Sequence, residues 1–526
     1  MRRIVHALTV VVLLAGFYVL CLAILAALVA LDVVVTKADA SAPALAREVA
    51  IAYLLTAVAV YVVVRGVFVS TRVRHRHIVG VMVTDRDEPA LWERVRFLAR
   101  AVGTRPPARI YLVPDVNAAV WENAKLLGLI PGRRSMMIGM PLLIALTPAQ
   151  FDSVIAHELG HYGNRDTRLG ALDHRARESV MAAVAAAQGR LTARRGADGK
   201  PRRFRLPGQA VFVALFRMYA RLVLSVTQHA SRRQEIAADS VAAAIAGQAN
   251  AAAGLRELPA VEAAFSFYID RYVAAGVERD MLPIPGEVLG GFAALLAEPS
   301  RRAELDDLRQ DPTAETPDPF DSHPAIRDRI ATIEALPPDG RPLDTSDARA
   351  LATLSDPKAT LAAVGARMLV RNGAGKQSVD WDTLATAAAA DRAARSADPL
   401  RIAVASFYQQ PRALSGLLDA IDAGQLGEIL DRLPKSDGAT KVKAGTRAAR
   451  ELAKTSMIPM VAAWALAELA AQGRVRWRNS WADADGAIEM APDLDEKLQA
   501  AVDALAAVSP DAGPMRAVVY AMGVPA

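Results

Sequence analysis

Two long apolar runs open the chain, and a mixed pattern follows them. The first run, Ile4 to Val35, is interrupted only by His6, Thr9 and Asp32. A helix needs about 20 apolar residues to cross a bilayer, whereas the apolar core of a cleaved signal peptide has only about 7–15. The first run therefore predicts a retained transmembrane helix over residues 1–36.

The second apolar run, Val49 to Val69, contains Arg65 and is shorter, so a buried core helix is an alternative for it. The residues that follow this run favour a transmembrane helix. Arginines stand at positions 72, 74 and 76, as they do at positions 2 and 3 before the first run. Positive charge stays on the cytoplasmic side of a membrane. We therefore expect a second span over 49–70, an extracytoplasmic loop over 37–48, and a multi-pass cell-membrane protein with its remaining chain in the cytoplasm.

A helix and two strands are predicted in the next hundred residues. Asp87 to Val102 repeats apolar residues at helical spacing, with Leu91, Val95 and Leu98 on one face. Two short β-rich runs bounded by Gly and Pro read as strands, Arg109–Val113 and Ser135–Gly139. The second of them precedes a further helix, and we expect it to form a sheet edge to which an extended peptide can add.

That further helix carries the chemistry. Thr147 and Pro148 are suited to its N-cap and first position, and His157-Glu158-x-x-His161 follows. Residues four apart share a helix face, so both imidazoles can reach one ion while Glu158 stands to the side as general base. This spacing is typical of zinc metalloproteases. It also occurs by chance on solvated helices, but only eight histidines exist in the chain.

A catalytic zinc takes three protein ligands. A third histidine six residues after His161 is excluded, because Thr167 stands there. Glu235 is the best remaining candidate, and Asp239 one turn later can accept a hydrogen bond from a ligand histidine. Taken alone, Glu235 also fits a solvated position on an Arg-flanked helix.

The composition of the chain limits the kinds of partner and metal site that it can have. The net charge is +6, which favours a membrane surface. Aromatic residues make up only 5% of the chain, and the sequence has no basic-aromatic face for base stacking, so we expect no nucleic-acid partner. The single cysteine, Cys21, rules out a disulfide or a thiolate metal site within one chain. Any metal must use histidine and carboxylate ligands.

The later chain has weaker signals. Arg301 to Pro319 is charged and contains prolines, and we expect a mobile flap there. Pro337 to Gly340 marks a domain end, after which Ala-rich helices are expected. Their predicted ranges are Asp347–Leu354, Thr360–Arg371, Trp381–Ala394, Pro399–Tyr408, Arg412–Leu433 and Leu494–Val508, with a hairpin within Gly473–Met490. We interpret residues 341–526 as a helical accessory domain that offers surfaces to protein partners.

Four separated motifs resemble peptidase family M48. This family of membrane-associated zinc peptidases includes HtpX-type quality-control proteases and the multi-span CAAX prenyl proteases. The motifs stand in the family's order between about Pro89 and Leu336: Val116-Asn117-Ala118, the His157–His161 motif followed by Asp166, Glu235 to Asp239, and His323-Pro324 with Arg329-Ile330. One departure is Ala119-Val120-Trp121-Glu122, where the family often has an aromatic and then small residues.

The resemblance implies one Zn²⁺ per chain, held by His157, His161 and Glu235, with Glu158 as the base. Asn117 and His323 would line the cleft and stabilise the oxyanion, with Asp239 and Asp166 behind the ligands. The fold it implies is mainly α with a small β-sheet, an α+β zincin-like (gluzincin) domain over 71–340, behind the two transmembrane helices.

The expected function is therefore a membrane-anchored zinc endopeptidase acting on membrane or misfolded proteins at the cytosolic face. Two alternatives are a CAAX-type prenyl-protein protease, which would need a larger intramembrane chamber than two spans can build, and a membrane adaptor with a structural zinc fold. Val211 to Val226 contains Arg217 and Arg221, so it is expected as an amphipathic helix rather than a third span. The basic segment Arg194–Arg205 is either a lipid-headgroup contact or a solvated loop.

Overall fold

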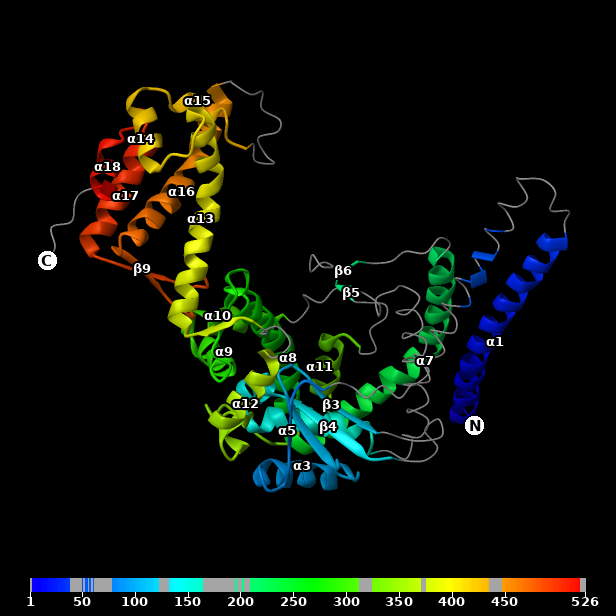
Figure 1. Cartoon of the computed structure of the whole chain (residues 1–526). Helices are drawn as coiled ribbons and strands as arrows, with labels where there is room; N and C mark the ends of the chain where they lie inside the picture. Colours follow the sequence, from blue (N-terminus) through cyan, green and yellow to red (C-terminus); the bar gives the residue numbers. More distant parts are fainter. Residues whose placement is uncertain are drawn as a thin grey trace. The chain divides into compact units, whose positions relative to one another are not determined.

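The computed structural model describes most of the chain (Figure 1). The described ranges are 2–37, 78–122, 132–163, 209–311, 324–369, 375–434 and 447–520, with short pieces at 50, 53–54, 56–57, 60, 194–195 and 201–202. Within three long helices only part of the side chains is described. Contacts divide the chain into two compact units, Met1–Ala263 with Leu305–Thr360, and Ala264–Glu304 with Leu361–Ala526. The domain boundaries drawn from composition stay a prediction.

A four-stranded sheet organises the first unit, in the order β1-β2-β4-β3. Its strands are β1 (Val81–Val83), β2 (Arg109–Val113), β3 (Ala118–Glu122) and β4 (Arg134–Gly139). The two predicted strands, β2 and β4, are confirmed; β1 and β3 were not predicted. Since β4 pairs in parallel with β2 and antiparallel with β3, it is an inner strand. The expectation that it forms the edge was wrong, and β3 takes that place.

Helices α3 (Pro89–Val102), α4 (Met140–Ala145) and α5 (Pro148–Gly160) pack with this sheet. The apolar face predicted for α3 is buried at Leu91, Val95 and Leu98.

The start of α5 is fixed as its sequence predicts. Thr147 is the N-cap and Pro148 the first helical residue. The Gln150 N–H donates to Thr147 Oγ1 at 3.3 Å, and the Thr147 N–H donates to Gln150 Oε1 at 3.0 Å. This reciprocal pair satisfies two backbone donors that a helix start leaves open. The Arg94 Nε of α3 donates to the buried Asp152 carboxylate at 2.7 Å, which ties α5 to its neighbour.

One 38-residue helix, α7 (Gln209–Ala246), contains both the amphipathic segment and the Glu235 motif. It packs closely on α5: a Cβ added to Gly160 would lie 3.3 Å from Ala238 Cα. Helix α1 (Arg2–Lys37) contacts the other end of α7, where the Tyr219 hydroxyl donates to the Leu13 carbonyl. Small residues at the α5–α7 contact therefore determine how near the two motif-bearing helices come.

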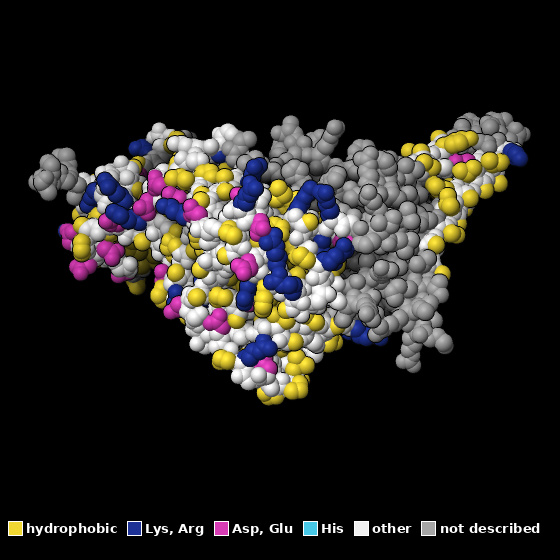
Figure 2. Space-filling view, turned by 90° about the horizontal axis from the view of Figure 1, so that it is seen from below, with side chains coloured by type: hydrophobic (Ala, Val, Ile, Leu, Met, Phe, Trp, Pro, Cys, Tyr) yellow, Lys and Arg dark blue, Asp and Glu magenta, His cyan; other side chains and the backbone are white. Residues whose placement is uncertain are grey.

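Apolar side chains project from α1 into solvent. Figure 2 shows them as a mainly hydrophobic surface along this helix. Those with large exposed fractions are Val12, Val19, Leu22, Val29, Val33 and Val34. Among the residues described above, no helix meets the length and hydropathy needed to cross a bilayer.

The rest of the first unit is made of short elements and connecting helices. They are β5 (Arg194–Arg195), β6 (Pro201–Arg202), α8 (Gln248–Tyr268), α10 (Pro299–Gln310), α11 (Ile326–Glu334) and η6 (Ala350–Thr353). Of the flap expected over Arg301–Pro319, residues 301–310 are helical in α10, and residues 312–319 lie outside the described residues. In α10, Arg309 pairs with Glu257 of α8 at 2.6 Å, a contact between helices that composition does not reveal.

The second unit is mainly helical. Its elements are η3 (Ile269–Val273), η4 (Val277–Arg279), β7 (Met281–Pro283), α9 (Val288–Ala297), α12 (Pro357–Leu369), β8 (Gln377–Val379), α13 (Trp381–Tyr408), α14 (Leu414–Asp422), α15 (Leu426–Leu430), α16 (Arg447–Ala471), β9 (Val475–Arg478), β10 (Ala487–Met490), α17 (Pro492–Ala506) and α18 (Gly513–Tyr520). The predicted hairpin is confirmed as β9–β10. The two helices expected around Pro399 are one helix, α13, and α16 and α18 were not predicted.

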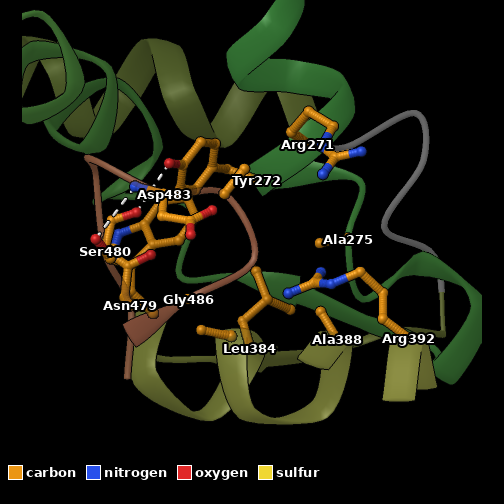
Figure 3. Close-up of a pocket in the computed structure, with 13 residues that line it drawn as sticks. Arg271, Tyr272, Ala275, Leu384, Ala388, Arg392, Asn479, Ser480, Asp483 and Gly486 are labelled. Carbon is orange, nitrogen blue, oxygen red and sulfur yellow. Dashed lines mark hydrogen bonds between the residues drawn. The ribbon is translucent and has the colours of Figure 1, made fainter. Parts of the chain in front are cut away.

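A small hollow lies beside the hairpin loop. Figure 3 shows Arg271 and Arg392 on one side of it and Ser480 and Asp483 on the other, above Leu384 of α13. Both arginines pair with the Asp485 carboxylate, at 3.0 and 3.2 Å. The β9–β10 loop is thereby fixed against the helices of its own unit.

The close approach of α5 and α7 predicts a strong size limit at Gly160. Gly160→Val would push a branched side chain against the Ala238 backbone, and such overpacking costs about 1–3 kcal/mol. The free energy of unfolding, measured by denaturant titration, should fall by that amount. Gly290→Val in α9 is the control, because an added Cβ there meets nothing within 4 Å. Equal stability of the two variants would contradict this packing.

Candidate metal centre

Two histidines face one another at the end of α5. His157 is buried in the last helical turn and His161 is the C-cap residue, with the two ring centroids 4.8 Å apart at an interplanar angle of 84°. One ligand atom each of His157, Glu158 and His161 lie within 4.8 Å of one another. The helical spacing of four residues therefore brings together two of the predicted metal ligands, His157 and His161, with the predicted base Glu158 beside them.

Glu235 of α7 completes this group from the opposite side. Its Oε2 lies 3.5 Å from His157 Nε2, and its Oε1 lies 3.7 Å from His161 Nε2. Ligands about 2.0–2.1 Å from a tetrahedral zinc ion are about 3.3–3.4 Å from each other. The spacing and the donor types, two imidazoles and one carboxylate, thus fit zinc. Glu158 comes from the same helix as the histidines and is only partly buried, which suits a group that acts beside the ion.

Asp239 lies behind His157, one turn further along α7. Its Oδ1 is 2.9 Å from His157 Nδ1, and its side chain is 3% exposed. A carboxylate at this distance keeps a proton on Nδ1, so Nε2, which faces Glu235, is the nitrogen that a metal ion would use. The predicted role of Asp239 as hydrogen-bond acceptor is consistent with this geometry.

Arg329 of α11 is a fourth buried charge, to which the sequence analysis gave no role. Its Nε and Nη2 donate to the two carboxylate oxygens of Asp239, at 2.9 and 2.7 Å. Its Nη1 lies 3.7 Å from Glu235 Oε2. In the sequence, Arg329 stood out only as part of the His323-Pro324 and Arg329-Ile330 motif. The usable signal was chemical, since an arginine on the buried side of a helix must find an acidic partner.

The electrostatics of the centre follow from burial and from these contacts. Burial lowers the pKa of His157, but hydrogen bonds to Asp239 and Glu235 raise it more, to about 9. Burial likewise raises the pKa of Asp239, but hydrogen bonds from Arg329 and His157 outweigh this and leave it below its ordinary value. In the metal-free protein the carboxylates therefore hold a proton on His157.

The other predicted site residues are placed less fully. Asn117 is exposed just before β3, and its carbonyl accepts a hydrogen bond from the Gly139 N–H at 2.7 Å. His323 and Asp166 lie outside the described residues. The roles of all three stay predictions.

The edge strand lies beside the histidine helix. The Tyr162 hydroxyl, next to His161, donates to the Val120 carbonyl of β3 at 2.9 Å. The Arg134 guanidinium of β4 lies 4.4 Å from the centre of the Tyr162 ring. These contacts hold the end of α5 against β3, the strand whose outer side is available within the described sheet.

Residues 85–336 match peptidase family M48. The match covers 252 of the 526 residues, so this segment is similar to M48 peptidases. The matched segment includes His157, Glu158, His161 and Glu235, and the family is one of zinc metallopeptidases, so the chain is a metallopeptidase.

Curated relatives agree with this assignment at modest identity. A protease HtpX homolog of Pseudarthrobacter chlorophenolicus is 26% identical over 297 residues, which cover 56% of this chain and 89% of the relative. Homologs from Listeria monocytogenes and Sulfurisphaera tokodaii are 33% and 38% identical, over 17% and 16% of this chain. The chain spans just over a quarter of the length of these two relatives, 28% and 27%. No solved structure matches the chain.

The raised pKa of His157 makes the stability of the metal-free protein depend on pH. Its folded pKa, about 9, lies above the ordinary value of 6.5, so the stabilisation is complete below pH 6.5 and is lost as the pH rises through 9. The unfolding temperature of chelator-treated protein should fall across this interval.

Asp239→Asn is the matched variant, because it removes a carboxylate that accepts a hydrogen bond from His157. The fall in unfolding temperature should then occur at lower pH. Zinc-loaded protein should lack the fall, since a metal-bound imidazole carries no proton on its ligand nitrogen. An unfolding temperature of chelated wild type that is equal at pH 6.5 and 9 would contradict the assignment.

Proposed function

We propose that the chain is a membrane-anchored zinc endopeptidase that hydrolyses membrane or misfolded proteins at the cytosolic face. The observation that carries this is the meeting of α5 and α7, which brings the Glu235 carboxylate within 3.5 and 3.7 Å of the two imidazoles. The centre combines two buried proposed ligands, His157 and Glu235, with a partly exposed His161 and a partly exposed Glu158 beside them. A purely structural zinc site, as in the adaptor alternative, has no need of such a base.

His157, His161 and Glu235 would hold the ion, with Asp239 fixing the tautomer of His157. Zinc held by these residues would polarise the scissile carbonyl and lower the pKa of a water toward about 7. Glu158 accepts the proton of the attacking water and then donates it to the leaving amine nitrogen. Asn117 and His323 would stabilise the negative charge that develops on the carbonyl oxygen.

The proposed substrate is an extended polypeptide segment. The outer side of β3 offers backbone donors and acceptors beside the centre, and an extended peptide can pair with such an edge. This recognition is mainly through backbone groups and suits substrates of varied sequence. A prenylated CAAX substrate would require a lipid chamber, which is why the general endopeptidase is preferred.

Membrane attachment rests on the sequence and on α1. Two apolar runs with arginines at their outer ends support spans over 1–36 and 49–70, and α1 is a 36-residue helix with many exposed apolar side chains. The likeness to proteases named HtpX homologs supports the same arrangement. The alignment with the homolog of Pseudarthrobacter chlorophenolicus covers 89% of that relative's length. The second unit would offer surfaces to protein partners.

Glu158→Gln and Glu235→Ala should separate catalysis from metal binding. Glu158→Gln removes the base but no proposed ligand, so casein hydrolysis should fall at least about 100-fold with one zinc per chain retained. Glu235→Ala removes a ligand, so both zinc and activity should be lost. Zinc content is measured by atomic absorption, and a chelator should abolish wild-type activity.

Glu278→Ala, a substitution of an exposed glutamate in the second unit, is the control and should retain both properties. Full activity in Glu158→Gln at normal zinc content would refute the mechanism. Unchanged zinc in Glu235→Ala would remove this residue from the ligand set. Hydrolysis by the wild type that resists the chelator would refute the zinc enzyme altogether.

The proposed topology can be tested with single cysteines, because Cys21 is the only native one. In a Cys21→Ser background, Lys200→Cys should react with a membrane-impermeant maleimide only after the cells are opened. Ser41→Cys, in the proposed extracytoplasmic loop, should react in intact cells. Labelling of residue 200 in intact cells would reverse the proposed orientation.

A further inference from the structure

Among the described arginines, Arg329 is the one whose guanidinium contacts the proposed zinc ligands His157 and Glu235 and also Asp239 behind them. It lies on α11 with only 7% of its surface exposed. Its Nη2 lies 3.3 Å from the ring nitrogens of His157, and its Nη1 lies 3.7 Å from Glu235 Oε2. A buried arginine this close to a cation site is unexpected, because like charges repel.

The contact with Asp239 explains its presence. Nε and Nη2 of Arg329 donate to the two oxygens of Asp239 in a fork, at 2.9 and 2.7 Å. A guanidinium presents two parallel donors to one carboxylate, and this geometry restricts rotation of the carboxylate. A lysine ammonium is a point charge and lacks the fork.

Asp239 Oδ1 serves two partners at once. It lies 2.9 Å from His157 Nδ1 and 2.7 Å from Arg329 Nη2. Because Arg329 fixes both carboxylate oxygens, the acceptor of His157 Nδ1–H has one orientation. The ring of His157 is then held with Nε2 toward Glu235, as zinc binding requires.

Arg329 also keeps Asp239 from acting as a competing ligand. The described centre contains three carboxylates, those of Glu158, Glu235 and Asp239, and one arginine. The arginine occupies the oxygens of Asp239, whereas its contact with Glu235 is a longer 3.7 Å to a single oxygen. The carboxylate of Glu235 is therefore the one left to face the two imidazoles.

We propose that Arg329 is a positioning residue of the metal centre, which orders His157 for zinc through Asp239. The inference rests on the proposed zinc site. Two explanations of Arg329 predict opposite changes in zinc affinity. Simple charge repulsion predicts that removing Arg329 tightens zinc binding, whereas positioning predicts that removal weakens it.

The test compares zinc dissociation constants of full-length protein in detergent, measured by competition with a chromophoric chelator. Loss of a group that orients a metal ligand costs about 10–100-fold in metal affinity. Arg329→Gln is expected near the upper end of this range and Arg329→Lys, which keeps the charge but loses the fork, near the lower end. Arg327→Gln, an exposed arginine on the same helix, should bind zinc as the wild type does.

A double-mutant cycle tests whether Arg329 affects zinc binding through Asp239. If Arg329 acts through Asp239, Arg329→Gln combined with Asp239→Asn should bind zinc no more weakly than the weaker single variant. Independent effects would instead multiply. The rise in unfolding temperature on zinc addition provides a second readout, because a merely structural arginine would lower the metal-free and zinc-loaded values equally.

Tighter or unchanged zinc binding in Arg329→Gln, or multiplied losses in the cycle, would overturn the inference. If Arg329→Gln does not fold, wild-type affinity in Arg329→Lys would overturn it equally. These results are distinct from a failure of the proposed function, which would appear as a wild-type chain that binds no zinc and would refute both.

Discussion

The close approach of two helix backbones is the constraint on which the metal centre depends. Gly160 and Ala238 have little or no side chain where α5 meets α7, so groups on the two helices come within 4 Å of each other. Glu235 and Asp239 are one turn apart on α7 and flank this contact. One faces the ligand nitrogens and the other faces the far side of His157. A wider separation would leave a histidine pair with neither a third ligand nor a fixed tautomer.

Local signals made half of this arrangement predictable. The N-cap at Thr147, the histidine spacing and the apolar face of α3 depend on residues within a turn or two of each other, and the structure has them where the sequence places them. β3 and the inner position of β4 depend on pairing between segments, so the edge strand was assigned wrongly. Pro399 indicated a helix break, but α13 continues through it as one helix.

Arg329 could not be found from local pattern for the same reason. It is 90 residues from Asp239 in sequence, so its position on the buried side of a helix indicates that an acidic partner exists but not which residue it is. Three carboxylates in one centre carry a large electrostatic cost, which buried arginine and a divalent cation can offset together. The family motif marked the position, while the geometry supplied the reason for an arginine there.

The parallel pairing of β7 with β8 has a consequence for synthesis. Met281–Pro283 finds its partner strand in Gln377–Val379, about a hundred residues later. At roughly 5–20 residues per second, a ribosome needs on the order of 5–20 seconds to supply that partner. The histidine helix α5 and helix α7 precede β7 in the chain. The contact between α5 and α7 can therefore form before β8, the partner of β7, has been synthesised. Residues 264–304 thus belong to a part of the molecule that is completed late, and truncation near residue 340 would leave this strand permanently without its partner.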